Sequence, residues 1–409
     1  MSSITVFSGI FCGEAAVIQD VIASTGFKPV TDDDIVGMAA KSSGAPESKI
    51  RRAFSTKTSV FNQFTHEKEC SIAHLRLAVA EKLLKNNLMI VGFSSLLIPK
   101  TISHILRVCL IADMGSRIRQ AGAEQKLSEK EAVKIIHQDD GNRIQWVNTL
   151  FSLGDPWEES LYDMLIPMDK IKAYQAGALI EENLLKEVVH PTKESRQASQ
   201  DFLLSSQTEV ALCEAGHNVT VTAENGSVLL TINKHVLMLS RLEEELKSIA
   251  QNVPGVTTVE TRIGKGFHKS NIYRKHNFET PSKVLLVDDE REFVQTLSER
   301  LMLRDMGSAI AYDGESALNV VKEDDPEVII IDLKMPGVNG IEVLKRVKKA
   351  RQEIEVIVLT GHGSESDKKL CMDLGAFAYM QKPVDINELS DAIKKAYEKI
   401  HSKCRSLNT

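Results

Sequence analysis

The chain has 409 residues, 43% of them hydrophobic, and a formal net charge of −6 at pH 7. This length allows two to four domains, each with its own core. The mild negative charge excludes a general electrostatic attraction to nucleic acid or to anionic membranes. The longest apolar stretch, residues 88–98, is interrupted by Gly92, Ser94 and Ser95 and is too short to span a bilayer.

The N-terminus has no basic segment of the kind that opens an export signal, so a cytoplasmic location is expected. The six cysteines, at positions 12, 70, 109, 213, 371 and 404, contain no CxxC pair. A chain of this size does not need covalent cross-links to be stable. We therefore expect all six to be reduced thiols.

The N-terminal region begins with a predicted strand at Ile4–Phe7, a glycine-containing loop at Ser8–Gly13 and a helix at Glu14–Ser24. This order is typical of loops that bind phosphate at a helix N-terminus. Two key residues differ, however. Glu14 stands where a lysine should contact phosphate, and Ala15 stands where a hydroxyl should hold Mg²⁺. The Glu14 carboxylate would repel a nucleotide phosphate.

Further along the first 195 residues, four more segments carry a family pattern: Gly26–Val36, Leu106–Ala112, Asp140 with Arg143, and Leu161–Ile166. Through them, residues 1–195 resemble the cytidylate-kinase-like family of nucleoside monophosphate kinases, which have a P-loop α/β fold. The resemblance implies that Arg117, Arg119 and Arg143 are lid residues that clamp phosphate, since guanidinium makes planar bidentate contacts. The chain departs from the family at Val91–Ser95, where a glycine-arginine pair is expected.

Two interpretations of residues 1–195 follow. One is a pseudokinase that keeps the fold as a ligand-sensing or protein-binding module. The other is an active nucleotide kinase in which another cation replaces the missing lysine. For the three arginines, a solvated helix face is an equally good interpretation.

Residues 196–264 form a smaller predicted unit. Its elements are a strand, a hairpin turn, a returning strand, a helix and a last strand, at Val219–Thr222, Asn225–Gly226, Ser227–Asn233, Leu239–Gln251 and Thr258–Ile263. The segments Asn225–Leu230 and Val253–Val259 make this α+β unit similar to a BON domain. The similarity, in a chain without an export signal, implies a role in protein contacts.

Residues 265–281 form a linker that mixes basic and aromatic residues: Lys265, Phe267, His268, Lys269, Tyr273, Arg274, Lys275 and His276. Cations interleaved with aromatic rings can contact RNA or DNA. Four cations with no other basic surface are more typical of a solvated hinge. No helix-turn-helix pattern follows, so we expect no DNA-binding output.

From residue 282 to residue 403, short β-branched runs alternate with amphipathic helical segments. Strands are predicted at Lys283–Val287, Ser308–Tyr312, Val328–Asp332, Val356–Thr360 and Ala378–Gln381. Five such βα units make a doubly wound, flavodoxin-like parallel sheet. The carboxyl ends of its strands face one crevice, where Asp288, Asp289, Asp332 and Thr360 should meet.

This crevice has the residues of a pocket that is phosphorylated. Crowded carboxylates favour a hard cation such as Mg²⁺. Lys382 can pair with one phosphoryl oxygen as a point charge, and Thr360 can donate a hydrogen bond to another. Asp332 is then the nucleophile, which forms an aspartyl phosphate.

These residues, together with the run Asp332–Gly337 and Lys382-Pro383, make residues 282–403 resemble the receiver domain of two-component response regulators. The resemblance implies that the carbonyl of Lys334 is a further Mg²⁺ ligand beside Asp288, Asp289 and Asp332. It also implies that Tyr379 is an aromatic switch that turns inward on phosphorylation, and that the Lys382–Pro383 peptide is cis. The alternative is a degenerate receiver that keeps the fold without being phosphorylated.

The expected protein is a response regulator of a phosphorelay. A sensor histidine kinase or a phosphotransfer protein would phosphorylate Asp332, and the N-terminal modules would act on an unidentified protein partner. The alternative is a nucleoside monophosphate (cytidylate) kinase that binds nucleotide in its N-terminal domain and is regulated by its receiver. The substitutions at Glu14 and Ala15 make the signalling role the favoured one.

Overall fold

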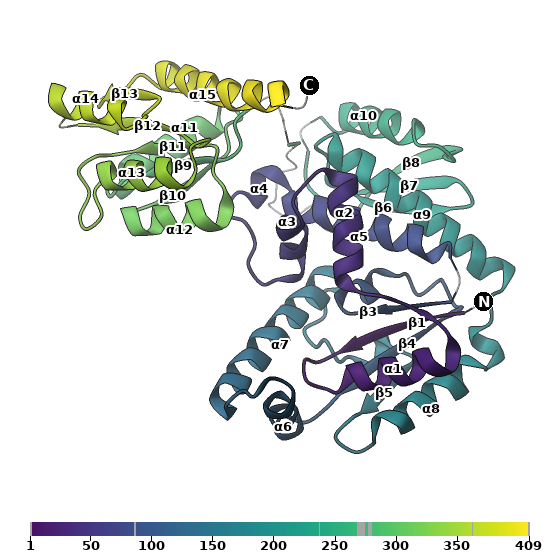
Figure 1. Ribbon diagram of the computed structural model, residues 1–409. Helices are drawn as coiled ribbons and strands as arrows, with labels where there is room; N and C mark the ends of the chain where they lie inside the picture. Colours follow the sequence, from purple (N-terminus) through teal and green to yellow (C-terminus); the bar gives the residue numbers. More distant parts are fainter. Residues whose placement is uncertain are drawn as a thin grey trace. The chain divides into compact units, whose positions relative to one another are not determined.

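The computed structural model describes residues 2–85, 87–236, 238–267, 275–276, 280–361 and 363–407 (Figure 1). The chain divides into two compact units, Met1–Thr58 with Lys68–Tyr273, and Ser59–Glu67 with Arg274–Thr409. The predicted linker residues His268, Lys269, Tyr273 and Arg274 lie outside the described residues. No helix in the described part of the chain is long and apolar enough to cross a membrane.

A five-stranded parallel sheet with the order β2-β3-β1-β4-β5 forms the centre of the first unit. Its central strand is buried along its whole length, as expected for a parallel sheet covered on both faces. The strands are β1 (Ser3–Ser8), β2 (Lys28–Val30), β3 (Leu88–Val91), β4 (Ile105–Ile111) and β5 (Met164–Pro167). The predicted strand, loop and helix at the N-terminus are confirmed.

Helices cover both faces of this sheet, because successive side chains of a strand point to opposite faces. Val6 packs with α1 and α8 in one apolar cluster, and Phe7 packs with α2, α5 and α7 in another. The helical elements of this part of the chain are α1 (Glu14–Thr25), α2 (Asp32–Ser43), α3 (Glu47–Arg51), η1 (Arg52–Phe54), α5 (Glu67–Leu83), η2 (Phe93–Leu97), α6 (Met114–Gln125), α7 (Glu129–Phe151), η3 (Glu159–Leu161), α8 (Ala173–Leu184), η4 (Glu187–Val189) and α9 (Lys193–Glu214).

One expectation about the cysteines is wrong. Cys70 of α5 and Cys213 of α9 form a disulfide, with their Cα atoms 5.6 Å apart and a sequence separation of 143. Such a separation carries no pairing signal, since only the fold brings α5 beside α9. Cys12, Cys109 and Cys371 are free and buried.

The chain after α9 forms the predicted small sheet, with the order β6-β7-β8. Its elements are β6 (Thr220–Glu224), β7 (Ser227–Ile232), α10 (Leu239–Gln251) and β8 (Thr258–Ile263). Asn225 and Gly226 form the turn between β6 and β7, and both have positive φ, as an Asn-Gly hairpin requires. Membership of the BON family stays a prediction.

The second unit contains a five-stranded parallel sheet with the order β10-β9-β11-β12-β13. Each predicted strand is confirmed to within one residue at either end. Its elements are β9 (Val284–Val287), α11 (Arg291–Met302), β10 (Ser308–Ala311), α12 (Gly314–Asp324), β11 (Val328–Ile331), α13 (Gly340–Ala350), β12 (Glu355–Thr360), α14 (Glu365–Asp373), β13 (Ala378–Gln381) and α15 (Ile386–Leu407). This is the flavodoxin-like arrangement predicted from the sequence.

In this order, the direction in which strands are added reverses at β9 and β11. Ligands of open α/β sheets bind at such a switch point, outside the carboxyl ends of the strands. Asp288 directly follows β9 and Asp332 directly follows β11. The topology therefore brings the two carboxylates to the same crevice.

Candidate functional site

The crevice of the second unit is lined by polar side chains at the ends of adjacent strands. Asp288, Asp332 and Thr360 are only 4%, 7% and 1% exposed, respectively. Buried carboxylates are stable only with a counter-charge or hydrogen-bond donors. The contacts of each carboxylate therefore show what the site is built to hold.

Lys382 supplies the counter-charge. Its Nζ donates a hydrogen bond to Asp288 Oδ2 at 2.6 Å and lies 3.9 Å from Asp332 Oδ1. Burial works against the ammonium, but the hydrogen bond to Asp288 and the charges of Asp288 and Asp332 outweigh it and raise the pKa of Lys382. One permanent cation thus stands between two carboxylates. The predicted cis peptide between Lys382 and Pro383 is confirmed.

Sequence reasoning missed two further groups around this lysine. Glu290 Oε1 lies 3.4 Å from Lys382 Nζ, and the Phe293 ring centroid lies 4.3 Å from it. A cation over an aromatic face gains electrostatic energy, and the ring also limits where the flexible side chain can move. The position of Glu290 next to the acidic pair was the only available signal for its role.

Backbone amides orient the two carboxylates. The Lys334 N–H donates to Asp332 Oδ2 at 3.0 Å, which leaves Oδ1 facing Lys382. The Glu290 N–H donates to Asp288 Oδ1 at 2.9 Å. Burial raises the pKa of Asp288, although its hydrogen bonds from Lys382 and Glu290 act in the opposite direction. A cation beside Asp288 therefore stabilises the ionised carboxylate, which burial alone would disfavour.

The predicted metal ligands are only partly brought together. Asp288 and Asp332 flank one cationic position, and their oxygens are the hard donors that Mg²⁺ prefers. Asp289 is exposed, and within the described residues no three His, Cys, Asp or Glu side chains are grouped to hold a metal ion.

The predicted switch pair is also close together. Tyr379 packs against the apolar cluster on one face of the sheet, and its buried hydroxyl has no hydrogen-bond partner among the residues that the structure describes. A side chain added at Gly363 would collide with that hydroxyl and come within 2.9 Å of Thr360 Cγ2. Tyr379 is therefore turned inward, next to Thr360, in this structure.

Backbone amides of the glycine-containing loop in the first unit donate hydrogen bonds to other groups of the protein. The Gly9 N–H donates to the Leu110 carbonyl at 3.2 Å, and the Cys12 N–H donates to the Gly9 carbonyl at 3.3 Å. The Ile10 N–H donates to a carboxylate oxygen of Asp139 at 3.3 Å. A loop that cradles phosphate presents such amides to the ligand. Here a protein carboxylate takes the place of the anion.

Two of the three predicted lid arginines also bind protein carboxylates. Arg117 makes a bidentate pair with Asp140 at 2.8 and 2.9 Å and donates to the Ile10 carbonyl at 2.9 Å. Arg143 pairs with Asp139 at 2.7 Å, and its guanidinium lies 4.9 and 4.7 Å from the rings of Phe7 and Phe93. Only Arg119 is exposed; it donates to Ser116 Oγ at 2.7 Å.

Glu14 contributes a further negative charge beside this loop. Burial raises the pKa of Glu14, Arg143 lowers it, and Asp139 raises it further. The loss of phosphate binding predicted from Glu14 and Ala15 stays a prediction. The region around the loop is a network of internal ion pairs.

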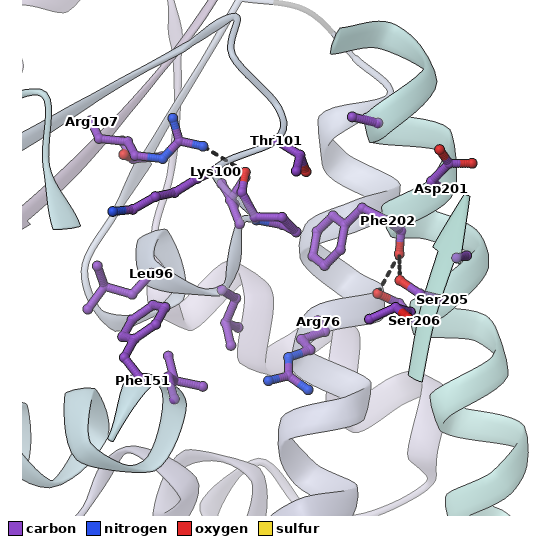
Figure 2. A pocket seen from close by; sticks show the side chains of 18 of the residues that line it. Arg76, Leu96, Lys100, Thr101, Arg107, Phe151, Asp201, Phe202, Ser205 and Ser206 are labelled. Carbon is purple, nitrogen blue, oxygen red and sulfur yellow. Dashed lines mark hydrogen bonds between the residues drawn. The ribbon is translucent and has the colours of Figure 1, made fainter. Parts of the chain in front are cut away.

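A pocket of about 1230 Å³ lies elsewhere in the first unit, beside α9 and β6 (Figure 2). The two arginines of its lining are engaged with the protein: Arg76 pairs with Glu209 at 2.6 Å, and Arg107 donates to the carbonyl of Pro99 at 2.7 Å. Sequence reasoning missed this pocket because its walls come from segments as distant as Thr5 and Asn225.

Comparisons with known proteins match two parts of the chain. Residues 284–394 match the response regulator receiver domain family, and residues 4–170 match the cytidylate kinase-like family. The transcriptional regulatory protein CpxR of Escherichia coli (strain K12) is 38% identical over 120 residues, which are 29% of this chain and 51% of that protein. The chain thus spans about half the length of this relative.

A second relative is matched over nearly its whole length. Sporulation initiation phosphotransferase F of Bacillus subtilis (strain 168) is 36% identical over 113 residues, which are 28% of this chain and 91% of that protein. Among solved structures, a response regulator receiver domain protein from Clostridium thermocellum is 34% identical. That match covers 28% of this chain and 94% of the other, with a TM-score of 0.28.

Proposed function

Because this chain belongs to the response regulator receiver family through residues 284–394, we propose that Asp332 accepts a phosphoryl group from a sensor histidine kinase or a phosphotransfer protein. The observation that supports this best is the position of Lys382 Nζ between Asp288 and Asp332. A buried nucleophilic carboxylate with a fixed cation beside it suits a reaction that brings in a negatively charged group. The protein would act in the cytoplasm.

The residues of the crevice have distinct roles in this transfer. Asp332 Oδ1 attacks phosphorus, a P–O bond forms, and the P–N bond to the donor histidine breaks. Lys382 turns from Asp288 to an oxygen of the incoming group, and the Thr360 hydroxyl donates to another. Asp288, Asp289, Asp332 and the Lys334 carbonyl would hold Mg²⁺, which neutralises the charge that accumulates on the phosphoryl oxygens.

Phosphodonor labelling with and without metal tests this proposal. The full chain incubated with acetyl phosphate and Mg²⁺ should carry one acyl phosphate, which is stable in acid and labile in base. Addition of a chelator before the phosphodonor should lower the labelling by at least about 100-fold, because charge-stabilising groups in such sites contribute about 3–4 kcal/mol each. Intact-mass spectrometry reads out the label. Equal labelling with and without chelator would contradict the metal assignment.

The switch would follow from the same geometry. A phosphoryl group on Asp332 draws the Thr360 hydroxyl towards it, and Tyr379, which already lies inward beside Thr360, fills the space that Thr360 vacates. Phosphorylation then raises the population of one of two existing arrangements of Thr360 and Tyr379, and it does not create a new arrangement. The readout would pass to the N-terminal modules, including the BON-like one, and from them to a protein partner.

For residues 4–170 we propose a pseudokinase. The Asp139 carboxylate accepts the Ile10 N–H and pairs with Arg143, which are the kinds of contact a nucleotide phosphate would need. A phosphate would have to displace that carboxylate in a site where Glu14 adds like charge. Both effects work against nucleotide binding.

A coupled assay for ADP release separates this proposal from a receiver-regulated cytidylate kinase. With ATP, CMP and Mg²⁺ present, the full chain should release no ADP above the blank, because the lysine and hydroxyl that orient phosphates and metal are absent. An authentic cytidylate kinase in the same assay serves as the positive control. ADP release that depends on CMP, before or after phosphorylation of the receiver, would establish the kinase instead.

A further inference from the structure

Nine residues of the N-terminal half belong to the second compact unit, which contains the receiver and is called the receiver unit. Ser59–Glu67 lie in the sequence within the segment that matches the cytidylate kinase-like family, yet they group with Arg274–Thr409. The segment contains the short helix α4 (Asn62–Thr65). The residues before it, to Thr58, and after it, from Lys68, belong to the first unit.

Phe61 anchors this segment. Its side chain is 0% exposed and belongs to the same apolar cluster as receiver residues from β9, β10, β11, β12, α12 and α13. A buried aromatic side chain removes some 150–250 Å² from water. The adjacent Val60 is 43% exposed, so burial within the segment is selective. Phe61 therefore fills a place in the core of the receiver unit.

Two further contacts surround this anchor. A Cβ atom at Gly307 would lie 2.6 Å from Phe64 Cγ, so the glycine makes room for the ring. Glu67 Oε1 lies 2.5 Å from Nζ of Lys283, and the two side chains are only 18% and 12% exposed. Lys283 directly precedes β9. Three contacts thus hold the segment on the receiver unit. They are the buried Phe61 ring, the Phe64 ring against Gly307, and the partly buried ion pair of Glu67 with Lys283.

The segment also has a physical route to the phosphorylation site. The apolar cluster that contains Phe61 is the one against which Tyr379 packs. At its other end the segment continues into α5, which begins at Glu67 and places Leu75 and Val79 in the core of the kinase-like unit. The segment is thus linked to both places: it shares an apolar cluster with Tyr379, and the chain continues from it directly into α5.

We propose that Ser59–Glu67 is the receiver's output element in cis, and that the receiver surface around Phe61 is where phosphorylation acts on the kinase-like unit. The partner of this surface is the chain's own segment rather than a separate protein. The proposal rests on the proposed function for its signal, since phosphorylation of Asp332 has to bias the cluster. The anchoring itself is independent of phosphorylation.

Hydrogen exchange of the full chain, read by mass spectrometry, tests the anchoring first. Phe61→Ala should speed exchange of the β9 and β10 amides by about 100-fold or more, as expected for removal of a fully buried phenyl ring. Phe61→Leu, which keeps most of the apolar volume, should show a smaller increase of the same pattern. Val60→Ala is the matched control and should leave these amides unchanged. Unchanged β9 and β10 exchange in Phe61→Ala would overturn the proposal.

A second arm adds acetyl phosphate and Mg²⁺. Exchange of residues 59–75 should change at least threefold in the wild-type chain and not in Asp332→Asn, and Phe61→Ala should lose the change while still being labelled. A labelled wild-type chain with constant exchange in 59–75 would overturn the output role. If no label forms, the proposed function fails, whereas the comparison without phosphodonor still decides the anchoring.

Discussion

Asp332→Asn should abolish phosphoryl labelling of the full chain. The amide nitrogen that replaces one carboxylate oxygen has no charge with which to attack phosphorus, so we expect a loss of more than about 1000-fold, as for removal of a covalent nucleophile. The crevice should otherwise be preserved, because the Lys334 N–H that donates to Asp332 Oδ2 can still donate to the amide oxygen. Intact-mass spectrometry after incubation with acetyl phosphate and Mg²⁺ measures the result.

Asp391→Asn is the matched control for this variant. Asp391 is an exposed carboxylate on α15, so the same substitution there should leave labelling at the wild-type level. Circular dichroism of both variants would show that the fold is kept. A base-labile label that persists in Asp332→Asn at the wild-type level would show that another residue is the acceptor.

Arg117→Met should destabilise the first unit by about 3 kcal/mol, because breaking a buried ion pair leaves its partner charge unpaired. The guanidinium of Arg117 holds both oxygens of Asp140 and the carbonyl of Ile10, and its side chain is only 7% exposed. Methionine keeps the length of the side chain but none of its donors. The backbone amides of the glycine-containing loop and of the start of α6 should lose most of their protection from hydrogen exchange.

Tryptophan fluorescence during urea unfolding measures this change. Both tryptophans of the chain, Trp146 and Trp157, lie in the first unit, so the signal reports that unit alone. Arg119→Met is the matched control: Arg119 is exposed and donates to Ser116 only at the surface, so its loss should cost less than about 0.5 kcal/mol. Equal midpoints for the two variants would contradict the structural role of Arg117 and support a ligand-facing one.

The fold of the receiver could be predicted from the sequence almost completely. Its strands are continuous β-branched runs that end in polar residues, and both features are local, so periodicity alone placed each strand to within one residue. Asp332, Thr360 and Lys382 each follow or end a strand, so the topology of a parallel sheet brings them together. The small module was predicted as well, because Asn225 and Gly226 specify one turn type.

The N-terminal site was harder to predict. Glu14 and Ala15 stand where a lysine and a hydroxyl are expected, and the family resemblance implied that Arg117, Arg119 and Arg143 clamp phosphate, with a solvated helix face as an equally good interpretation. Asp139 lies one helical turn from Arg143 and pairs with it, and Asp140 pairs with Arg117. These pairings became apparent only once the fold placed α6 and α7 next to the loop. The sequence alone does not distinguish an arginine that binds a ligand from one that pairs with a carboxylate of its own chain.

The sequence by itself determined the identity of the groups at the crevice, since strand-end carboxylates, a threonine and a lysine occur there by local pattern. Only the tertiary structure decided which partners those and other charged groups have: Lys382 with Asp288, Arg117 with Asp140, Cys70 with Cys213, and Phe61 within the receiver core. The reason is physical. A strand or a turn depends on neighbours in the chain, whereas an ion pair, a disulfide or a packed ring depends on atoms that tens to hundreds of residues of folded chain bring into contact.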